Sequence, residues 1–468
     1  MRIPRRDWQE HMEKLRKYGQ EHVLEFWDEL GYSSQERLIG QIASIDFELL
    51  KRLKTEHIDS DKAEQGSTEE KDFRPPETIE LPGPTDDISE RTRARKIGEE
   101  LLREDKVAVF MVAGGQGSRL GFDGPKGCFS ITPVKGKSLF QLHSEKLFAL
   151  GKKYGKRFPL YIMTSEDNHN ETKSFFTEND FFGLNEVHLF KQDMMPAMDK
   201  DGKLILSAKD EIFMNPNGHG GSLYALRDSG ALDDMRKKGV EHIYYMQVDN
   251  CLAKILDPVF IGYHKMMGSE MSNKAVKKAY PEEKVGVFGV VDGKNTVIEY
   301  SVLPDSLRYQ KDEKGELRFK AGNIAIHCID VDFVQEVCEK ELPFNKAFKQ
   351  IPYMSSQGGL IRPEEPNGYK FEMFIFDALQ MARKSITMMV DRKTEFAPVK
   401  NKDGNDSPET AKKMMSDLYK TWLRKCSIHV KDDAAVEISP LFALDAVELS
   451  KKIQGENIDT DSPEIYIG

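Results

Sequence analysis

Short, nearly continuous runs of apolar residues recur through the middle of the chain, and segments with helical spacing separate them. The apolar runs are residues 107–113, 159–164, 186–190 and 242–248. Each has the length and composition of a strand that is buried on both faces. Helical spacing covers residues 88–103, 138–154, 168–177 and 220–226. Strands and helices that alternate in this way predict βαβ units around a mainly parallel sheet, so the expected fold class is α/β.

The remaining segments have other patterns. Residues 285–330 are richer in strand patterns, and residues 371–384 have the spacing of a helix. Residues 8–30 and 35–53 predict two amphipathic helices, whereas residues 54–87 are polar and contain four prolines, which is typical of a solvated connection. Beyond about residue 388 the pattern weakens. We expect an N-terminal helical region with a linker (1–95), a central domain (96–387) and a small C-terminal domain (388–468).

Composition excludes several classes of protein. The formal net charge of -10 is opposite to the basic footprint that nucleic-acid binding requires, so we expect no nucleic-acid partner. The five cysteines are scattered, which favours reduced thiols in a cytoplasm over disulfides or a zinc site. No apolar run approaches the roughly 18 residues of a membrane span, and the N-terminus lacks the apolar core of a secretory signal. A cytoplasmic protein without membrane contact is the expectation.

A glycine-rich loop follows the first buried strand. It contains Gly114, Gly115, Gly117 and Gly121, together with Arg119 and Lys126. Glycines let the backbone come close to a ligand and direct N–H groups at an anion, and the two cations suit phosphate. In α/β folds, a strand that runs into such a loop is where nucleotides bind.

The spacing excludes the two commonest nucleotide motifs. A dinucleotide fingerprint that starts at Gly115 needs a third glycine where the chain has Leu120. A Walker A loop that ends in Gly136-Lys137-Ser138 needs a glycine where the chain has Ile131. Neither a dehydrogenase nor a P-loop ATPase is therefore favoured.

Asp249 comes directly after the apolar run 242–248. The carboxyl end of a parallel strand is where this architecture binds ligands. Phosphate chemistry on a nucleoside triphosphate needs a divalent cation, and Mg²⁺ is bound by one or two carboxylates with waters and phosphate oxygens. Asp249 is thus the candidate Mg²⁺ ligand.

Two further segments carry weaker signals. Gln192 has an amide that could pair with the edge of a nucleobase, although an isolated glutamine is more often solvated. Gly218, Gly220 and Gly221 form a second glycine cluster around His219.

Together these blocks resemble the eukaryotic-type UDP-N-acetylglucosamine pyrophosphorylases within the UDP-sugar pyrophosphorylase family. The stretch VAGGQGSRLGFDGPKG is similar to the family's triphosphate-binding loop, and Val248-Asp249-Asn250 is similar to its VDN block. The resemblance covers roughly residues 95–425. It implies a Rossmann-like nucleotidyltransferase domain with a mainly parallel mixed sheet, an N-terminal helical appendage and a small C-terminal domain.

The resemblance also implies roles for individual residues. Arg119, Lys126 and Lys400 would be catalytic, with Lys400 reaching the phosphates from the C-terminal domain, and Asp249 would hold Mg²⁺. The residues implied to bind substrate are Gly114, Gly115, Gln192, Gly218, His219, Asn250, Gly286, Glu299 and Asn323. Glu299 and Asn323 have side chains that can fix sugar hydroxyls.

His219 is a departure from the N-acetylglucosamine enzymes, which typically have PDGNGG where this chain has Pro216-Asn217-Gly218-His219-Gly220-Gly221. The GHG triplet resembles the UDP-glucose and broad-specificity branches. The expected reaction is UTP plus N-acetylglucosamine 1-phosphate giving UDP-N-acetylglucosamine and pyrophosphate. The alternatives are a UDP-glucose or broad UDP-sugar pyrophosphorylase and a non-catalytic UDP-sugar-binding regulator. The expected partners are small-molecule substrates, in a monomer or weak homo-oligomer.

Overall fold

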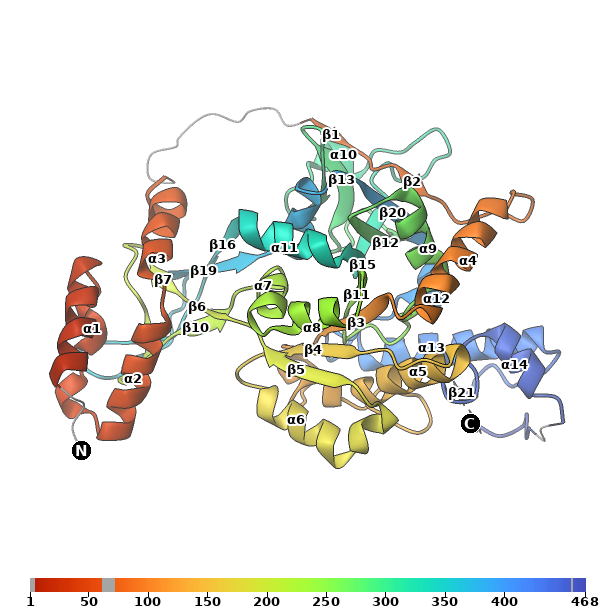
Figure 1. Ribbon diagram of the computed structural model, residues 1–468, viewed down its shortest axis with the longest axis horizontal. Coiled ribbons are helices and arrows are strands. Elements are labelled where there is room, and N and C mark those ends of the chain that lie inside the picture. The colour runs from red at the N-terminus through yellow and green to blue at the C-terminus, as the bar shows by residue number, and fades with distance from the viewer. Residues whose placement is uncertain (1–4, 61–71, 456–457) are drawn as a thin grey trace. The chain divides into compact units, whose positions relative to one another are not determined.

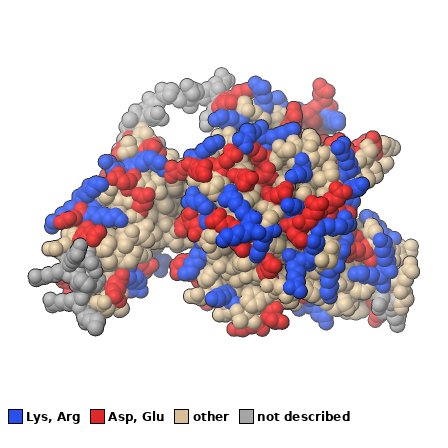
Figure 2. All heavy atoms as spheres, in the orientation of Figure 1, with Lys and Arg blue, Asp and Glu red and all other residues tan. Residues whose placement is uncertain are grey.

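The structure is a computed structural model that describes residues 5–60, 72–455 and 458–468. The chain forms two compact units. Unit 1 contains the described parts of residues 1–70 together with 193–221 and 342–375, and unit 2 contains the described parts of 71–192, 222–341 and 376–468. Basic and acidic side chains are interspersed over the face that Figure 2 shows.

Unit 2 is built on an eleven-stranded mixed sheet. Its main path is β2 (Thr78–Ile79), β20 (Ser385–Val390), β12 (Met271–Lys277), β15 (Ala321–Asp330), β11 (His242–Gln247), β3 (Val107–Val112), β4 (Leu160–Thr164) and β5 (Val187–Lys191). Beside β15 the sheet is extended by β13 (Val287–Val291), which pairs with β1 (Phe73–Arg74) and β14 (Lys294–Ile298). β15 is antiparallel to both β11 and β12, while the pairs from β11 to β5 and from β12 to β2 are parallel.

This strand order brings the functional segments to one edge. The carboxyl ends of β3, β5 and β11 lie at the same edge because these strands are parallel. β15 runs the other way, so its first residues lie at that edge too. The segments that follow β3, β5 and β11 and the segment that begins β15 are therefore neighbours, as expected for ligand binding in an α/β fold.

Helices cover the unit 2 sheet. They are α4 (Ser89–Arg103), α5 (Leu139–Tyr154), α6 (His169–Glu178), α7 (Gly221–Asp228), α8 (Ala231–Lys237), α9 (Pro258–Met267), α10 (Asp305–Arg308) and α11 (Val331–Lys340). In Figure 1, α6 and α8 lie on opposite sides of β4 and β5. The strands of this region are apolar on both faces for that reason: every residue of β4 is buried, as are five of the six in β3.

Glycines allow two of these helices to cross closely. A Cβ added to Gly98 of α4 would lie 1.9 Å from the carbonyl oxygen of Pro258, and one added to Gly262 of α9 would lie 1.7 Å from that of Ala94. Only glycine fits at both positions, so the α4–α9 contact depends on both.

The C-terminal residues of unit 2 form a further layer. It contains α12 (Arg392–Glu395), α13 (Pro408–Lys425), α14 (Ala446–Lys452) and the parallel pair β21 (Ala435–Ile438) and β22 (Glu464–Ile467). Ser407 begins α13 with a capping box, and Pro408 occupies its first turn. Apolar residues of these elements share one core cluster with β3 and β11.

Unit 1 contains α1 (Arg5–Lys17), α2 (Tyr32–Ser44), α3 (Phe47–Leu53) and several short antiparallel pairs. The pairs are β6 (Met194–Pro196) with β10 (Met214–Pro216), β8 (Leu206–Ala208) with β9 (Glu211–Ile212), and β17 (Tyr353–Met354) with β18 (Leu360–Ile361). A three-stranded sheet has the order β16 (Phe344–Lys349), β19 (Gly368–Met373) and β7 (Met198–Asp199).

The α/β class with a mainly parallel sheet is confirmed, but four expectations about elements were wrong. Residues 371–384 are not a helix: β19 ends at Met373, a 3₁₀ helix spans Ile375–Gln380, and β20 follows. Phe371 and Met373 are buried while the residue between them is not, so the segment has the period of two that an antiparallel strand requires.

The N-terminal errors have local causes. Residues 8–30 are not one helix, because Gly19 adopts a left-handed φ of 65° after α1, and residues 35–53 are divided where Asp46 caps α3. Residues 73–74 and 78–79 of the expected linker are β1 and β2, which belong to unit 2 and whose Phe73 and Ile79 pack against its core clusters. Residues 61–71 of that linker lie outside the described residues. The domain boundaries expected at 95 and 387 stay predictions; the division into compact units groups residues 376–468 with the glycine-rich loop that follows β3.

Candidate active site

The loop after β3 folds back on itself. The Gly117 amide donates to the carbonyl of Gly124 at 2.8 Å, and the Lys126 amide donates to that of Gly115 at 3.0 Å. Gly121 and Gly124 have φ values of 72° and 143°, which favour glycine. Gly115 and Arg119 are exposed, and among the described residues the Arg119 guanidinium makes no hydrogen bond or ion pair. The loop therefore presents backbone and an unpaired cation of the kind that binds phosphate.

Lys126 and Asp249 come together beside this loop. The Lys126 ammonium lies 3.3 Å from Oδ2 of Asp249, and the two side chains are 19% and 11% exposed. They arrive from the ends of neighbouring parallel strands, β3 and β11, which explains how residues 123 positions apart meet. The structure thus joins two residues that the sequence analysis had assigned to phosphate and to metal.

Gln192 lies at the end of β5, and its side chain faces the start of the loop. A Cβ added to Gly114 would lie 2.9 Å from Nε2 of Gln192, so any larger residue at 114 would displace this amide. The Gln192 backbone amide donates to Thr164 at 2.8 Å, while its side-chain amide has no hydrogen bond among the described residues. A buried amide without a partner is available to a ligand.

Gly286, Glu299 and Asn323 form a second cluster in unit 2. The backbone amide of Asn323 donates to the carbonyl of Gly286 at 2.8 Å. A Cβ added to Gly286 would lie 3.3 Å from Oε1 of Glu299. Burial raises the pKa of Glu299, whose carboxyl group is half-buried. Oδ1 of Asn323 accepts from the amide of Ala325 at 2.8 Å, which leaves Nδ2 of Asn323 as a donor. The cluster has one acidic acceptor and one amide donor, a set that suits sugar hydroxyls.

The segment that contains Lys400 runs beside the residues that follow β11. The Val399 amide donates to the carbonyl of Asp249 at 3.0 Å, and Asn250 pairs with Pro398 in an antiparallel bridge. Lys400 is exposed, with its ammonium 6.0 Å from the centroid of the Phe396 ring. The structure therefore places the backbone of residue 399 in direct contact with Asp249.

Asn250 uses its side chain within the protein. Nδ2 donates to the carbonyl of Glu395 at 2.8 Å, and Oδ1 accepts from the Ala397 amide at 2.9 Å. The expected contact of Asn250 with substrate stays a prediction, but these hydrogen bonds give its amide a different partner in this structure.

Asp406 is a site residue that the sequence analysis did not identify. Burial raises the pKa of its carboxyl group, and the charges that act on it come from Lys400, Glu283, Arg392 and Asp249. Its carbonyl accepts the amides of Lys400 and Asn401. Asp406 has a φ of 57° immediately before the cap of α13, and only the position of an aspartate before a capping box could have suggested it.

The second glycine cluster belongs to unit 1. Gly218 has a φ of 85°, and a Cβ there would lie 2.4 Å from the Met373 carbonyl oxygen, so the glycine is required by packing against β19. The His219 ring stacks on Phe374, with centroids 5.3 Å apart, and its Nδ1 accepts from the Ile375 amide at 3.1 Å. That bond places the ring proton on Nε2, and burial lowers the pKa of His219 to about 4.

The residues around Asp249 fit a magnesium ion. Asp249 supplies a hard carboxylate oxygen at the edge of the sheet, and its charge is among the causes that raise the pKa of Asp406. Among the described residues, the one cluster of three potential ligands is His242, His264 and Asp330. His242 begins β11 and Asp330 ends β15 at the opposite edge of the sheet, and His264 comes from α9.

Comparison with known proteins decides the family. The protein-family model described as UTP–glucose-1-phosphate uridylyltransferase matches residues 48–458 of this chain. The chain belongs to this family. It is 39% identical over 372 residues to a UDP-N-acetylglucosamine pyrophosphorylase of Saccharomyces cerevisiae, with 76% of this chain and 78% of that protein covered. It is 34% identical to the human UDP-N-acetylhexosamine pyrophosphorylase-like protein 1, with 96% and 95% covered.

A solved structure supports the same relationship. The uridine diphosphate N-acetylglucosamine pyrophosphorylase of Trypanosoma brucei, in complex with an inhibitor, is similar with a TM-score of 0.84 at 27% identity, covering 99% of this chain and 98% of that one. The resemblance that the sequence motifs indicated is confirmed. None of the helices in the described part of the chain is long and apolar enough to cross a membrane.

Proposed function

We propose that this protein transfers a uridylyl group from UTP to N-acetylglucosamine 1-phosphate, which gives UDP-N-acetylglucosamine and pyrophosphate. A phosphate oxygen of the sugar phosphate forms the new bond to the α-phosphorus of UTP, and the bond from that phosphorus to the pyrophosphate oxygen breaks. Both nucleophile and leaving group are phosphates, so no strong base is required, and rate acceleration depends on positioning and on charge stabilisation.

The observation that carries the proposal is the Lys126–Asp249 pair beside the glycine-rich loop. Arg119 and Lys126 would stabilise negative charge on the α-phosphate and on the departing pyrophosphate. Asp249 would hold Mg²⁺, which neutralises and orients the triphosphate when bound. Lys400 would contact the sugar phosphate, and the unpaired amide of Gln192 would contact uracil.

The sugar end of the proposal rests on Glu299, Asn323 and Gly286. Glu299 is a half-buried acceptor with no side-chain hydrogen bond among the described residues, and Nδ2 of Asn323 is a donor. A sugar that lacks a matching hydroxyl would leave these polar groups unpaired, and the free-energy cost of unpaired groups would discriminate strongly against that sugar.

His219 supports the second candidate, a UDP-glucose or broad UDP-sugar pyrophosphorylase. Its neutral ring has its proton on Nε2, a donor where the N-acetylglucosamine enzymes have asparagine. A non-catalytic UDP-sugar-binding regulator is the third candidate, although the unpaired Arg119 and the Lys126–Asp249 pair favour catalysis. The expected cytoplasmic location and the monomeric or weakly associated state stay predictions.

The test is pyrophosphate release with UTP and Mg²⁺, using the 1-phosphates of N-acetylglucosamine, N-acetylgalactosamine, glucose and galactose. Preference for an N-acetylated sugar is the expected result. Preference for glucose or galactose would support the second candidate, and no release with any of the four would support the regulator.

Substitutions test the assigned roles in the same assay. Asp249→Asn and Lys126→Met should each lower kcat at least about 100-fold, the scale of losing a group that stabilises transition-state charge. Lys265→Ala is the matched control, because Lys265 forms an exposed ion pair with Glu241 at the opposite edge of the sheet. Arg119→Ala should lower turnover far more than it weakens UDP-sugar binding, and a comparable loss in both would contradict its role.

A further inference from the structure

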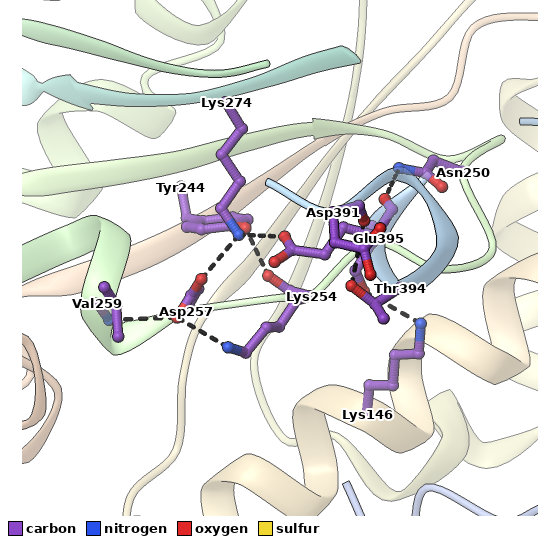
Figure 3. Close-up of polar contacts among 11 residues, drawn as sticks. Lys146, Tyr244, Asn250, Lys254, Asp257, Val259, Lys274, Asp391, Thr394 and Glu395 are labelled. Carbon is purple, nitrogen blue, oxygen red and sulfur yellow. Dashed lines mark hydrogen bonds and ion pairs between the residues drawn. The ribbon is translucent and has the colours of Figure 1, made fainter. Parts of the chain in front are cut away.

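A fully buried lysine of unit 2 contacts the segment that leads to Lys400. Lys274 of β12 is 0% exposed, and its ammonium contacts Oδ2 of Asp257 at 2.9 Å and Oε2 of Glu395 at 2.5 Å. Figure 3 shows Lys274 pointing at both carboxylates, with Lys254 on the far side of Asp257. Asp257 caps α9 and Glu395 ends α12, so one ammonium joins three elements.

The Lys274 ammonium keeps its charge at neutral pH. Burial by itself would lower the pKa of Lys274, but the two carboxylates outweigh it and raise the pKa above its usual range. Lys274 is therefore not a pH switch. Because desolvation offsets much of the attraction within a buried ion pair, such a pair contributes little net stability compared with an apolar core. The main effect of the Lys274 contacts is to hold β12, α9 and α12 in fixed positions relative to one another.

Glu395 is the first residue of a segment that is tied to Asp249. The Glu395 carbonyl accepts from Nδ2 of Asn250 at 2.8 Å, and the Ala397 amide donates to Oδ1 of Asn250 at 2.9 Å. Two residues later, the Val399 amide donates to the Asp249 carbonyl at 3.0 Å. Residues 395–399 thus run along the chain that follows β11 and deliver Lys400 directly after the last of these contacts.

We propose that Glu395, held by Lys274, and Asn250 are positioning residues that fix Lys400 relative to Asp249. This inference rests on the proposed function, since it assigns Lys400 to the phosphates. None of the three residues needs to contact substrate. The segment 395–399, which leads to Lys400, is anchored at both ends to the chain that follows β11.

The kinetic test is a double-mutant cycle on pyrophosphate release. Asn250→Ala and Glu395→Gln should each lower kcat about 10- to 100-fold with KM for UTP changed less than about 3-fold, since a displaced catalytic group costs rate on this scale. In a Lys400→Ala background, each should lower kcat less than about 2-fold further, because the group that they position is gone. If the fold-loss in kcat from Lys400→Ala and the fold-loss from Asn250→Ala or Glu395→Gln multiply in full in the double variant, the proposal is overturned.

A matched control separates positioning from general destabilisation. Glu145 of α5 forms an ion pair of similar burial with Lys137, at 2.6 Å, and within the described part of the chain this pair makes no hydrogen bond or ion pair with residues 395–400. Glu145→Gln should lower thermal stability about as much as Glu395→Gln and leave kcat unchanged. If Glu145→Gln reduces kcat equally, the effect of Glu395→Gln is structural and the proposal fails.

Hydrogen exchange provides a readout that does not require activity. In Glu395→Gln and Asn250→Ala, amides of residues 396–400 should exchange at least about 10-fold faster, while those of β3 remain unchanged. Unchanged exchange at residues 396–400 would overturn the anchoring. If the wild-type protein releases no pyrophosphate, the proposed function fails by itself, and exchange still decides whether the segment is held in this way.

Discussion

Lowering the pH from 7 to 5 is expected to destabilise unit 2 through one buried imidazole, that of His143. This side chain of α5 is 0% exposed, and its Nε2 donates to the carbonyl of Val248 at 2.9 Å, directly before Asp249. Its Nδ1 is buried without a partner among the described residues. A second proton would have to enter at Nδ1, where none of the described residues offers an acceptor for it, so the folded protein keeps this ring neutral.

The size of the effect follows from the pKa. Burial, aided by the charge of Lys146, lowers the pKa of His143 to about 3 in the folded state, against about 6.5 in the unfolded chain. Below pH 6.5 the unfolded chain therefore binds a proton that the folded protein does not, and stability falls as the pH falls. At pH 5, which is about 1.5 pH units lower, the loss is about 2 kcal/mol, at 1.36 kcal/mol per unit.

Tryptophan fluorescence can report this loss from unit 2 alone. The chain has three tryptophans, and Trp8→Phe with Trp27→Phe leaves Trp422 of α13 as the reporter. Urea unfolding at pH 7 and pH 5 is compared between this background and the same background with His143→Gln, which can donate to Val248 but does not titrate. The variant should lose about 2 kcal/mol less on acidification.

His429→Gln, at an exposed histidine of unit 2, is the matched control for replacing an imidazole with an amide. If His143→Gln and the background lose the same stability between pH 7 and pH 5, the reasoning about His143 is refuted.

Three other predictions concern single residues. Gly114→Ala should raise KM for UTP about 10-fold, because its Cβ would come within 2.9 Å of the Gln192 amide, and steady-state kinetics with an unchanged KM would contradict this. His219→Asn should shift kcat/KM from glucose 1-phosphate toward N-acetylglucosamine 1-phosphate, and an unchanged ratio would remove His219 from sugar selection. Burial opposes ionisation of Asp330, but hydrogen bonds from two histidines outweigh it and lower its pKa to about 2. Its contribution of about 2 kcal/mol is therefore present above pH 4 and lost as the pH falls toward 2, and Asp330→Asn should remove this loss in acid unfolding.

Local patterns predicted the parts of the fold in which burial and periodicity agree. Residues 107–113 and 242–248 are apolar without a break because helices cover both faces of the sheet, and both are strands. Ser138 caps α5 as its side chain and position suggest. The error at residues 371–384 arose because aromatic residues at short spacing suit either a helix or a strand, and pairing of β19 with β16 and β7 decided between them.

The sequence by itself determined the chemistry available to the site: a glycine-rich loop, Arg119, Lys126 and a carboxylate at the end of a strand, in an order that identified the family. Which of these groups meet was decided only by the tertiary structure. The Lys126–Asp249 contact depends on β3 and β11 being parallel neighbours, and the start of β15 reaches the same edge only because that strand runs the other way. Asp406 has only the weak local signal of an aspartate before a capping box, and the Lys274–Glu395 pair has none, since the burial of a charge and the identity of its partner depend on residues far away in the chain.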